Sequence, residues 1–522
     1  MRSPCDEAAI QSTGAETPCR KESRPWILAA TILGSSMAFI DGTVVNVALP
    51  ALQSSLHASV VDVQWVVESY GLFLAALILA GGVLGDMFGR RLMFLLGVSI
   101  FAAASIACAV AATINQLVIA RSVQGVGAAL MVPGSLSIIS ASFDGETRGK
   151  AIGTWSGFTA ITTAIGPILG GWLIEHVSWR WVFWINIPLA AAVIVISLWH
   201  VPESRNPEAH DVDWLGAVTA TVALAGLVYG LIDSSSRGWG HPLVWGSLIV
   251  GAGGLILFVL LEARERSPMV PLGLFKSRNF SGANLLTLFL YSALGIFFFL
   301  FPMNLIQVQG YSATATGAAA LPVILLMFSL SRWSGGLVSR YGPRTPLIIG
   351  PLIAAAGFAL FAVPSIGGSY WRTFFPGFLI LGFGMAVSVA PLTTAVMSSV
   401  GQGRSGTASG VNNAVARLAG VLAIAVFGLV MIGVFSSRLN ESLAKVSIPE
   451  PISHEIQSQE VRLAALTLPA GLDANTAKEV KMQISRAFVS GFRAIMLICA
   501  TLSVASSVVA WRLISKRIEE TA

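Results

Sequence analysis

Long apolar runs, separated by short polar segments, fill this chain between residues 25 and 512. An apolar helix of about 20 residues crosses the roughly 30 Å hydrocarbon core of a bilayer. Each run reaches that length, so the pattern predicts an all-α polytopic membrane protein with fourteen spans. The predicted spans cover residues 25–50, 63–85, 92–113, 115–142, 149–175, 179–200, 213–233, 242–261, 281–307, 314–339, 345–364, 373–400, 405–434 and 488–512.

One connection between the runs is much longer than the others. It covers residues 435–487 and is polar, with two segments of helical pattern, EIQSQEVRLAALTL and ANTAKEVKMQISRAF. We expect an extracytoplasmic loop there, folded as a solvated amphipathic hairpin.

The distribution of basic residues predicts the orientation, because cytoplasmic loops of membrane proteins are enriched in Lys and Arg. With the N-terminus inside, the cytoplasmic segments hold 19 Lys and Arg residues and the short outer loops hold 3. This asymmetry predicts that both termini are cytoplasmic and that the number of spans is even.

Composition supports a membrane protein and disfavours several other classes. Hydrophobic residues make up 55% of the chain and charged residues 11%, whereas a soluble domain has about 25% charged residues. The inner loops account for the net charge of +6, so no nucleic-acid partner is expected. The four Cys and six His residues lack ligand or pairing spacing, which predicts no metal site, disulfide framework or cofactor. The polar residues 1–24 lack the pattern of a cleavable signal peptide.

Two carboxylates, Asp41 and Glu68, lie well inside apolar stretches. A charged side chain at the centre of a membrane helix costs about 2.5 to 3.5 kcal/mol on insertion scales, so such groups are usually functional. A rise of about 1.5 Å per residue places Asp41, Glu68 and Arg121 in the outer half of the membrane, within one or two helical turns in height. If their spans belong to one bundle, the three side chains share one polar cavity.

The loop after the second predicted span reads GVLGDMFGRR, residues 82–91. Glycine permits tight turns and close helix contact, and a carboxylate there accepts charge-assisted hydrogen bonds. The loop resembles a signature of the major facilitator superfamily, with Met87 in place of the usual basic residue; the alternative is a generic basic turn. The positions that carry the resemblance are Gly82, Asp86, Gly89, Arg90 and Arg91. A weaker copy, GLVSRYGPR at residues 336–344, suggests an internal repeat of two halves.

Other segments resemble motifs of the fourteen-span drug:proton antiporters within that superfamily. DGTVVNVALP, with Asp41 and Asn46, is similar to their first-span signature, and RSVQGVG, which begins at Arg121, to their buried-arginine motif. WRWVFWINIP at residues 179–188 is also typical of this branch. A pattern of small residues in span five matches the antiporter motif in part, since Thr162 stands where a glycine is expected. Its members are Gly153, Gly166, Pro167, Gly170 and Gly171.

The resemblance covers nearly the whole chain and implies the major facilitator fold, with two six-helix bundles plus two extra central helices. The implied parts are a cytoplasmic tail at 1–24, an N-terminal six-helix bundle at 25–200, two inserted helices at 201–265, a C-terminal six-helix bundle at 266–512 that includes loop 435–487, and a cytoplasmic tail at 513–522.

The activity that the resemblance implies is proton-coupled export of drugs or other small amphipathic compounds by alternating access. Its partners are then a small-molecule substrate, protons and the lipid bilayer, and the protein is expected to be a monomer in the inner (cytoplasmic) membrane. Spans nine to fourteen contain no acid that the sequence places within the membrane. We therefore expect neutral, lipophilic or singly charged substrates.

The coupling role is expected to lie with the buried charges. Asp41 is the expected main coupling acid, Glu68 a second protonatable or cation-binding acid, and Arg121 the charge that tunes both. Two alternatives stay open: Asp41 as part of a structural ion pair, and Glu68 as an interfacial residue that reaches outward.

Other candidate residues are amides and small residues. Buried amides need partners, so the candidates for substrate binding are Asn46, Gln307, Asn412 and Asn413. The residues of the 82–91 loop and of span five are candidates for gating, with ordinary small-residue packing as the alternative for the glycines. Arg417 is a candidate partner of the Asp86 loop.

Three other functions compete with export. The first is a proton-coupled uptake symporter, which the span-five motif disfavours only by analogy. The second is a subunit of a proton-pumping redox complex, but such subunits rely on intramembrane lysines, and the only lysine in a predicted span here is Lys150, at the cytoplasmic end of span 149–175. The third is a membrane enzyme, for which the sequence offers no metal cluster, no nucleophile with a base, and no phosphate loop. We therefore expect a transporter that is not an enzyme.

Overall fold

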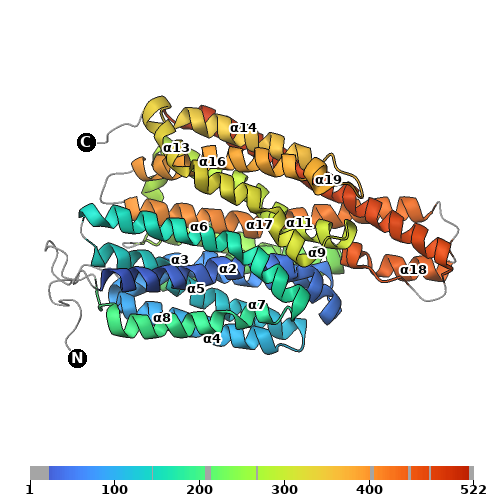
Figure 1. Ribbon diagram of the computed structural model, residues 1–522, viewed down its shortest axis with the longest axis horizontal. Helices are drawn as coiled ribbons and strands as arrows, with labels where there is room; N and C mark the ends of the chain where they lie inside the picture. The colour runs from blue at the N-terminus through green and yellow to red at the C-terminus, as the bar shows by residue number, and fades with distance from the viewer. Residues whose placement is uncertain are drawn as a thin grey trace. The chain divides into compact units, whose positions relative to one another are not determined.

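The structure, a computed structural model, is helical throughout the part of the chain that it describes (Figure 1). That part comprises residues 23–143, 145–205, 213–265, 268–399, 405–444, 448, 450–468 and 472–516. No strand occurs within these ranges, so the predicted all-α fold is confirmed.

Within the described ranges, thirteen helical segments are long and apolar enough to cross a membrane. The helix α6 (Gly145–His176) adds a helix of 32 residues that contains the predicted span 149–175. The chain is thus a multi-pass membrane protein, and the count of fourteen spans stays a prediction.

The polar connection predicted at 435–487 is shorter than expected. The helix α17 (Ser405–Leu443) continues past residue 435, and α19 (Ala474–Leu513) begins well before residue 488. Between them lie α18 (Glu450–Ser458) and the 3-10 helix η4 (Glu460–Ala465). The segment from residue 474 to residue 490 contains neither Pro nor Gly, so nothing interrupts the helix where the hydrophobic run gives way to polar residues.

Two compact units make up the molecule. The first comprises Met1–Val45, Val66–Ala225 and Val250–Leu272, and the second comprises Asn46–Trp65, Gly226–Ile249 and Gly273–Ala522. The long helices α2 (Arg24–Leu56) and α3 (Val60–Phe88) each contribute to both units. The predicted division into two bundles and two inserted helices stays a prediction.

The first unit contains most of the helices from the N-terminal half of the chain. Beyond its parts of α2 and α3, its helices are α4 (Arg90–Val110), α5 (Ile114–Ser142), α6, α7 (Trp181–Trp184) and α8 (Asn186–His200), with parts of α9 (Trp214–Arg237) and α10 (Pro242–Glu262). Helices α4 and α5 lie against each other along their length. Glycine makes this approach possible, because a Cβ on Gly97 would lie 2.8 Å from the carbonyl oxygen of Gly127.

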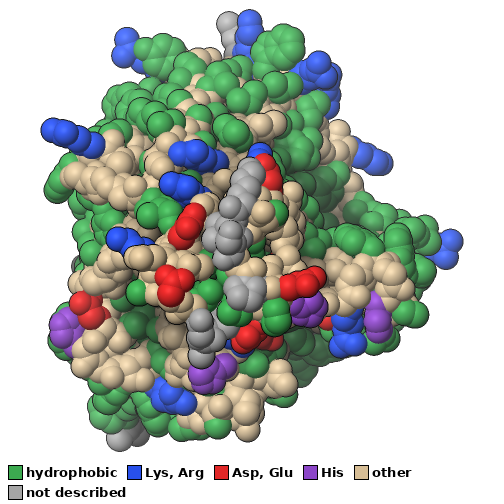
Figure 2. Space-filling view, turned by 90° about the vertical axis from the view of Figure 1, so that its right-hand side faces the viewer, with side chains coloured by type: hydrophobic (Ala, Val, Ile, Leu, Met, Phe, Trp, Pro, Cys, Tyr) green, Lys and Arg blue, Asp and Glu red, His purple; other side chains and the backbone are tan. Residues whose placement is uncertain are grey.

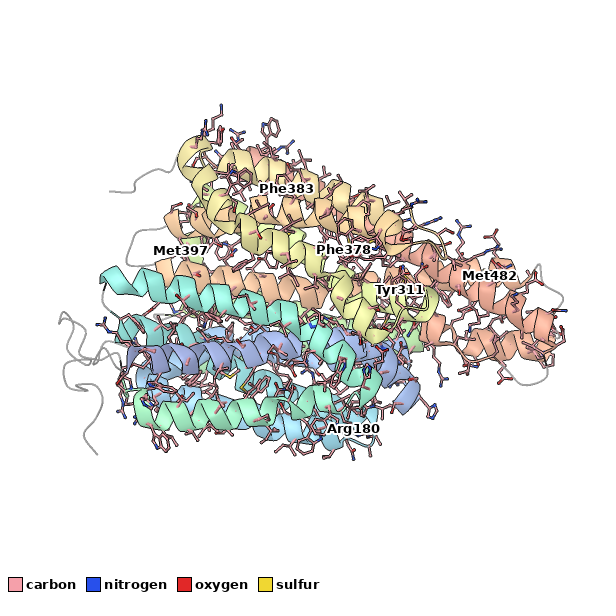
Figure 3. All side chains as sticks on the ribbon, in the orientation of Figure 1. Arg180, Tyr311, Phe378, Phe383, Met397 and Met482 are labelled. Carbon is pink, nitrogen blue, oxygen red and sulfur yellow. The ribbon has the colours of Figure 1, made fainter. Side chains whose placement is uncertain are left out.

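The second unit is built around six long helices and an aromatic core. It contains η1 (Leu272–Lys276), α11 (Arg278–Met303), the π-helix η2 (Asn304–Val308), α12 (Ala313–Ala319), α13 (Leu321–Tyr341), α14 (Arg344–Phe361), α15 (Tyr370–Thr373) and α16 (Phe375–Ser398), followed by α17 to α19. Phe297, Phe301, Phe361 and Phe378 are buried, and the rings of Phe361 and Phe378 lie 4.9 Å apart between centroids. Figure 3 labels Phe378 of this group. The aromatic side chains of α11 therefore pack in the core of this unit.

Charged and polar side chains are concentrated at helix ends. Figure 2 looks at the end of the molecule where α18 lies, and it shows acidic, basic and histidine side chains together on that face. Hydrophobic side chains are common at the margins of the same view, with single Lys and Arg side chains projecting among them. This is the distribution that a bilayer imposes, since its core solvates apolar side chains and its surfaces solvate charges.

Candidate functional site

An ion pair between Asp41 and Arg121 lies at the centre of the first unit. Asp41 is in the middle of α2 and Arg121 is in α5, and their side chains are 0% and 1% exposed. The Arg121 Nη1 donates to Asp41 Oδ2, and its Nε donates to the carbonyl oxygen of Val66 in α3 at 3.1 Å. The guanidinium also lies over the ring of Tyr70, 4.2 Å from its centroid.

Three further side chains complete this network. Gln124 Nε2 donates to Asp41 Oδ1 at 2.9 Å and to Ser105 Oγ at 2.8 Å. Asn186 Nδ2 lies 3.4 Å from the same carboxylate oxygen and 3.2 Å from Ser105 Oγ. We call Asp41, Ser105, Arg121, Gln124 and Asn186 the Asp41 network. Its members come from α2, α4, α5 and α8, so the network links four helices, with Ser105 of α4 joined through Gln124 and Asn186.

Glu68, in α3, has a different environment. Its side chain is 0% exposed, and neither carboxylate oxygen has a hydrogen-bond partner among the residues that the structure describes. The hydroxyl of the adjacent Ser69 is buried and equally without a partner in that part of the chain. An ionised carboxylate buried without a partner costs several kcal/mol. Glu68 therefore avoids this cost in one of two ways. Either it is protonated and neutral, or a cation lies beside its charged carboxylate.

The structure brings together part of what the sequence predicted. Asp41 and Arg121 are in direct contact, as expected from their similar depth. Glu68 lies two residues beyond Val66, whose carbonyl accepts from Arg121, but makes no hydrogen bond to Asp41 or Arg121. Its side chain is completely buried, which disfavours the alternative in which Glu68 reaches outward to the membrane surface.

Sequence reasoning assigned no site role to three members of the Asp41 network, namely Ser105, Gln124 and Asn186. Gln124 belongs to the RSVQGVG segment that begins at Arg121. Ser105 lies in an apolar run, and no feature of that run distinguished it from other small residues. Asn186 belongs to the WRWVFWINIP segment, and a buried amide within an apolar span was a signal that it needed a partner.

The loop at residues 82–91 forms a tight turn between α3 and α4. Arg90 Nε donates to Asp86 Oδ1 at 2.8 Å, and Arg90 Nη2 forms an ion pair with the same oxygen at 2.8 Å. Gly89 has a φ of 123°, which only glycine adopts readily. Gly82 is less constrained, since a Cβ there would meet only Pro133 at 3.7 Å.

Glu203, which follows α8, caps the start of α4. Its two carboxylate oxygens accept from the backbone N–H groups of Arg91 and Leu92, each at 3.1 Å. A Cβ on Gly89 would lie 2.6 Å from Glu203 Oε1, so the glycine also makes room for this cap. A carboxylate at a helix N-terminus satisfies free N–H groups and complements the helix dipole. No feature of the sequence indicated that Glu203 would take this place.

The small residues of α6 fall into two groups. A Cβ on Gly166 would lie 2.6 Å from Thr43 Oγ1, and one on Gly170 would lie 2.5 Å from Val44 Cγ1. These two glycines lie four residues apart and hence on one face of α6, which approaches α2 closely. Gly153 has no atom within 4 Å of its Cβ position. Gly171 is buried, and Pro167 lies inside the helix.

This difference leads to a prediction about stability. Gly170→Ala should lower the free energy of unfolding by about 1 to 3 kcal/mol, because the new methyl group overpacks against Val44. Gly153→Ala is the matched control and should leave stability unchanged or slightly higher. Thermal unfolding of both variants in detergent measures the effect. Equal midpoints for the two variants would show that α6 and α2 do not need this close approach.

The candidate amides lie in the second unit. Gln307 Nε2 donates to Gln53 Oε1 at 2.7 Å. Asn412 Nδ2 donates to Thr287 Oγ1 at 2.7 Å and to Asn284 Oδ1 at 3.1 Å, which links α17 to α11.

The remaining candidates, Asn46, Asn413 and Arg417, differ in their exposure. Asn413 is exposed, and Asn46 and Arg417 are half-buried. The roles of Asn46, Gln307, Asn412 and Asn413 in substrate binding stay predictions, as does the contact between Arg417 and the Asp86 loop.

Comparisons with known proteins match this chain to one family of membrane transporters and to drug-resistance proteins. The family model described as "Major Facilitator Superfamily" matches residues 31–424. A tetracenomycin C resistance and export protein of Streptomyces glaucescens is 34% identical over 513 residues, which cover 95% of this chain and 93% of that protein. The multidrug resistance protein Stp of Mycobacterium tuberculosis is 34% identical over 439 residues, covering 83% and 80%.

Solved structures show the same fold. A bacterial homolog of the human lysosomal transporter Spinster, in an inward-facing and occupied conformation, superimposes with a TM-score of 0.65. The match covers 96% of this chain and 99% of that one at 20% sequence identity. At this identity the match concerns the fold alone.

Proposed function

Because this chain belongs to the Major Facilitator Superfamily, and is therefore a membrane transporter and not an enzyme, we propose that it exports drugs or other small amphipathic compounds in exchange for protons. The names of its relatives, a resistance and export protein and a multidrug resistance protein, support the direction and the substrate class. The cytoplasmic membrane is the proposed location, and a monomer is the proposed unit.

The observation that carries the proton coupling is the contrast between the two buried carboxylates. Both oxygens of Asp41 have hydrogen-bond partners, since they accept from Arg121, Gln124 and Asn186. Glu68 is equally buried, and neither of its oxygens has a partner in the described part of the chain. A carboxylate with hydrogen-bond donors on both oxygens holds its neighbours in place, whereas one without partners can exchange a proton for another cation.

We therefore divide the roles differently from the sequence-based expectation. Glu68 is the site where a proton and a cationic substrate compete. Asp41 and Arg121 form the fixed pair that positions α3, because Arg121 also binds the carbonyl of Val66, two residues before Glu68. Release of the proton creates a buried charge on Glu68. The free-energy cost of that charge falls when a cation approaches or when the protein changes conformation so that water reaches Glu68.

The substrate range follows from this charge count. One exchangeable carboxylate neutralises one positive charge, so neutral, lipophilic or singly charged compounds are the proposed substrates. Asn46, Gln307, Asn412 and Asn413 are proposed as polar contacts for such compounds. The Asp86–Arg90 turn, the glycine face of α6 and Arg417 are proposed to take part in the conformational change.

A transport assay tests the function directly. Proteoliposomes with an acidic interior, diluted into neutral buffer, should accumulate a lipophilic monocation such as ethidium, because protons that leave drive the cation inward. Fluorescence of the probe follows the uptake, and a protonophore should abolish it.

The same assay distinguishes proton-coupled export from proton-coupled uptake by a symporter. An uptake symporter would accumulate the probe only when the outer buffer is the acidic one. Accumulation under that reversed gradient, or accumulation that ignores both gradients, would overturn proton-coupled antiport.

A further inference from the structure

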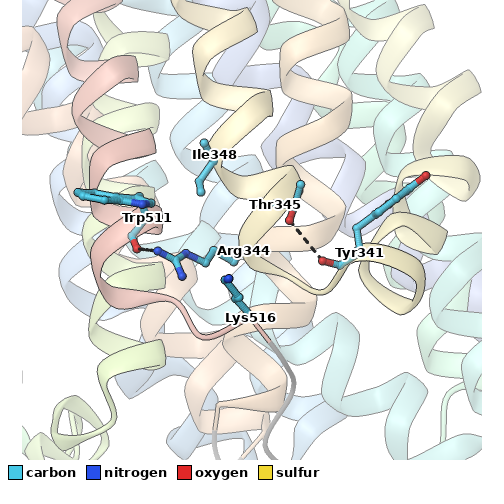
Figure 4. Close-up of a pocket in the computed structure, with 6 residues that line it drawn as sticks. All are labelled: Tyr341, Arg344, Thr345, Ile348, Trp511 and Lys516. Atoms are coloured by element: carbon cyan, nitrogen blue, oxygen red, sulfur yellow. Dashed lines mark hydrogen bonds between the residues drawn. The ribbon is translucent and has the colours of Figure 1, made fainter.

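A basic pocket lies at the end of the second unit, where α13 meets α14 and α19 ends. It has a volume of about 440 Å³. Its lining residues are Tyr341, Arg344, Thr345, Ile348, Trp511 and Lys516 (Figure 4). All belong to one unit, and none belongs to the proposed transport site.

The pocket carries two positive charges, and none of the described residues that line it is a carboxylate. Arg344 Nη2 donates to the carbonyl oxygen of Trp511, which fixes the guanidinium at the pocket wall (Figure 4). Arginine has five N–H donors, so several remain for a ligand. Lys516 is exposed, and its ammonium has no hydrogen bond or ion pair with any other residue that the structure describes. Such a pair of cations matches a phosphate group.

The aromatic residues identify the pocket as a membrane-surface feature. Trp511 is 56% exposed and Tyr341 is 52% exposed. Tryptophan and tyrosine are enriched where membrane helices meet the headgroup region, because their rings are apolar and their N–H and O–H groups are polar.

An exposed apolar surface continues from the pocket along the two helices. On α14, Ile349 and Leu352 lie four and seven residues beyond Thr345, and they are 47% and 44% exposed. On α19, Val508 and Val504 lie three and seven residues before Trp511, and they are 43% and 42% exposed. These spacings put the apolar residues on the helix faces that line the pocket, and α14 and α19 contact each other along their length.

We propose that this Arg344–Lys516 pocket binds the phosphate-bearing headgroup of an anionic phospholipid, whose acyl chains lie along α14 and α19. The charge pair recognises the phosphate, and the apolar faces of the two helices distinguish a lipid from a soluble anion. The distribution of basic residues assigns this end of the chain to the cytoplasmic side, where the leaflet is rich in anionic lipids.

Binding of short-chain lipids to the purified protein in a neutral detergent tests this site. Calorimetric titration with dioctanoyl phosphatidylglycerol, dioctanoyl phosphatidylcholine and inorganic phosphate separates headgroup charge from acyl contact. We expect phosphatidylglycerol to bind at least tenfold more tightly than either of the other two. Inorganic phosphate that binds as tightly as phosphatidylglycerol would replace the lipid site with a site for a free anion.

Variants place the binding in the pocket. Lys516→Gln should weaken phosphatidylglycerol binding about fivefold, since each basic residue near the surface contributes about 1 kcal/mol. Arg344→Gln combined with Lys516→Gln should weaken it more than tenfold. The Lys516 ammonium forms no hydrogen bond or ion pair with another described residue, so its loss should not impair folding. The Lys516→Gln variant therefore tests the site even if loss of Arg344 impairs folding.

A matched control removes two charges elsewhere. Arg205 and Arg264 are exposed and lie in the first unit, so Arg205→Gln with Arg264→Gln should leave phosphatidylglycerol binding unchanged. Equal weakening by both double variants would mean that net charge alone attracts the lipid, and unchanged binding in the Lys516 variant would also overturn the proposed site.

Discussion

Glu68→Gln is expected to abolish export driven by a proton gradient while leaving the protein folded. The amide has the shape of the protonated carboxyl group and carries no charge, so the variant is held in one state of the proposed cycle. Because the side chain is fully buried and without a partner among the described residues, removal of a possible charge should not lower stability and can raise it.

Two measurements separate a coupling defect from a general loss of activity. Gradient-driven accumulation of ethidium in proteoliposomes should fall to the level of empty liposomes, whereas exchange of a neutral substrate between equal concentrations should persist. The thermal unfolding midpoint should stay at or above that of the unaltered protein.

Asp62→Asn serves as the control on the same helix. Asp62 accepts from the backbone N–H and the hydroxyl of Ser59 at 2.7 and 2.8 Å, so its carboxylate has a local capping role at the start of α3. This variant should keep gradient-driven transport. If Glu68→Gln also keeps it, with the same dependence on the pH gradient, Glu68 does not exchange protons.

Asp41→Asn should have a different result, namely a loss of both stability and transport. The substitution leaves the guanidinium of Arg121 buried, at 1% exposure, without its counter-charge. Breaking a buried ion pair by removal of one partner costs about 3 to 5 kcal/mol. We expect a large drop in the unfolding midpoint and a low yield of folded protein.

A double variant distinguishes the ion pair from a coupling role. Asp41→Asn combined with Arg121→Gln removes both charges and should recover much of the lost stability, so the two effects should not be additive. Transport should remain low, because α3 loses the arginine that binds the Val66 carbonyl. An Asp41→Asn protein as stable as the original would contradict a buried pair at this position.

Much of the fold could be predicted from the sequence, because the bilayer imposes a length on every span. Apolar runs of about 20 residues mark membrane helices regardless of their neighbours. The boundaries at the polar ends were less predictable. α17 and α19 extend beyond the apolar runs, since helix formation continues wherever no residue interrupts it.

The candidate site was predictable in part for a related reason. Depth in the membrane is a one-dimensional quantity that can be counted along each helix, and it placed Asp41 and Arg121, which are in contact in the structure, at similar heights. Rotation of each helix about its axis and the choice of neighbours cannot be counted in this way. The places of Ser105 and Asn186 in the network, and of Glu203 at the start of α4, therefore did not follow from spacing.

The sequence by itself determined that this protein is a helical transporter of the Major Facilitator Superfamily with two carboxylates inside the membrane. Only the tertiary structure decided how those carboxylates differ. Both cost free energy to bury, and that cost depends on the donors that other helices bring to each oxygen. Asp41 receives donors from Arg121, Gln124 and Asn186, whereas Glu68 receives none from the described residues. The physical reason is that hydrogen-bond partners are set by helix packing, a property that no single span contains.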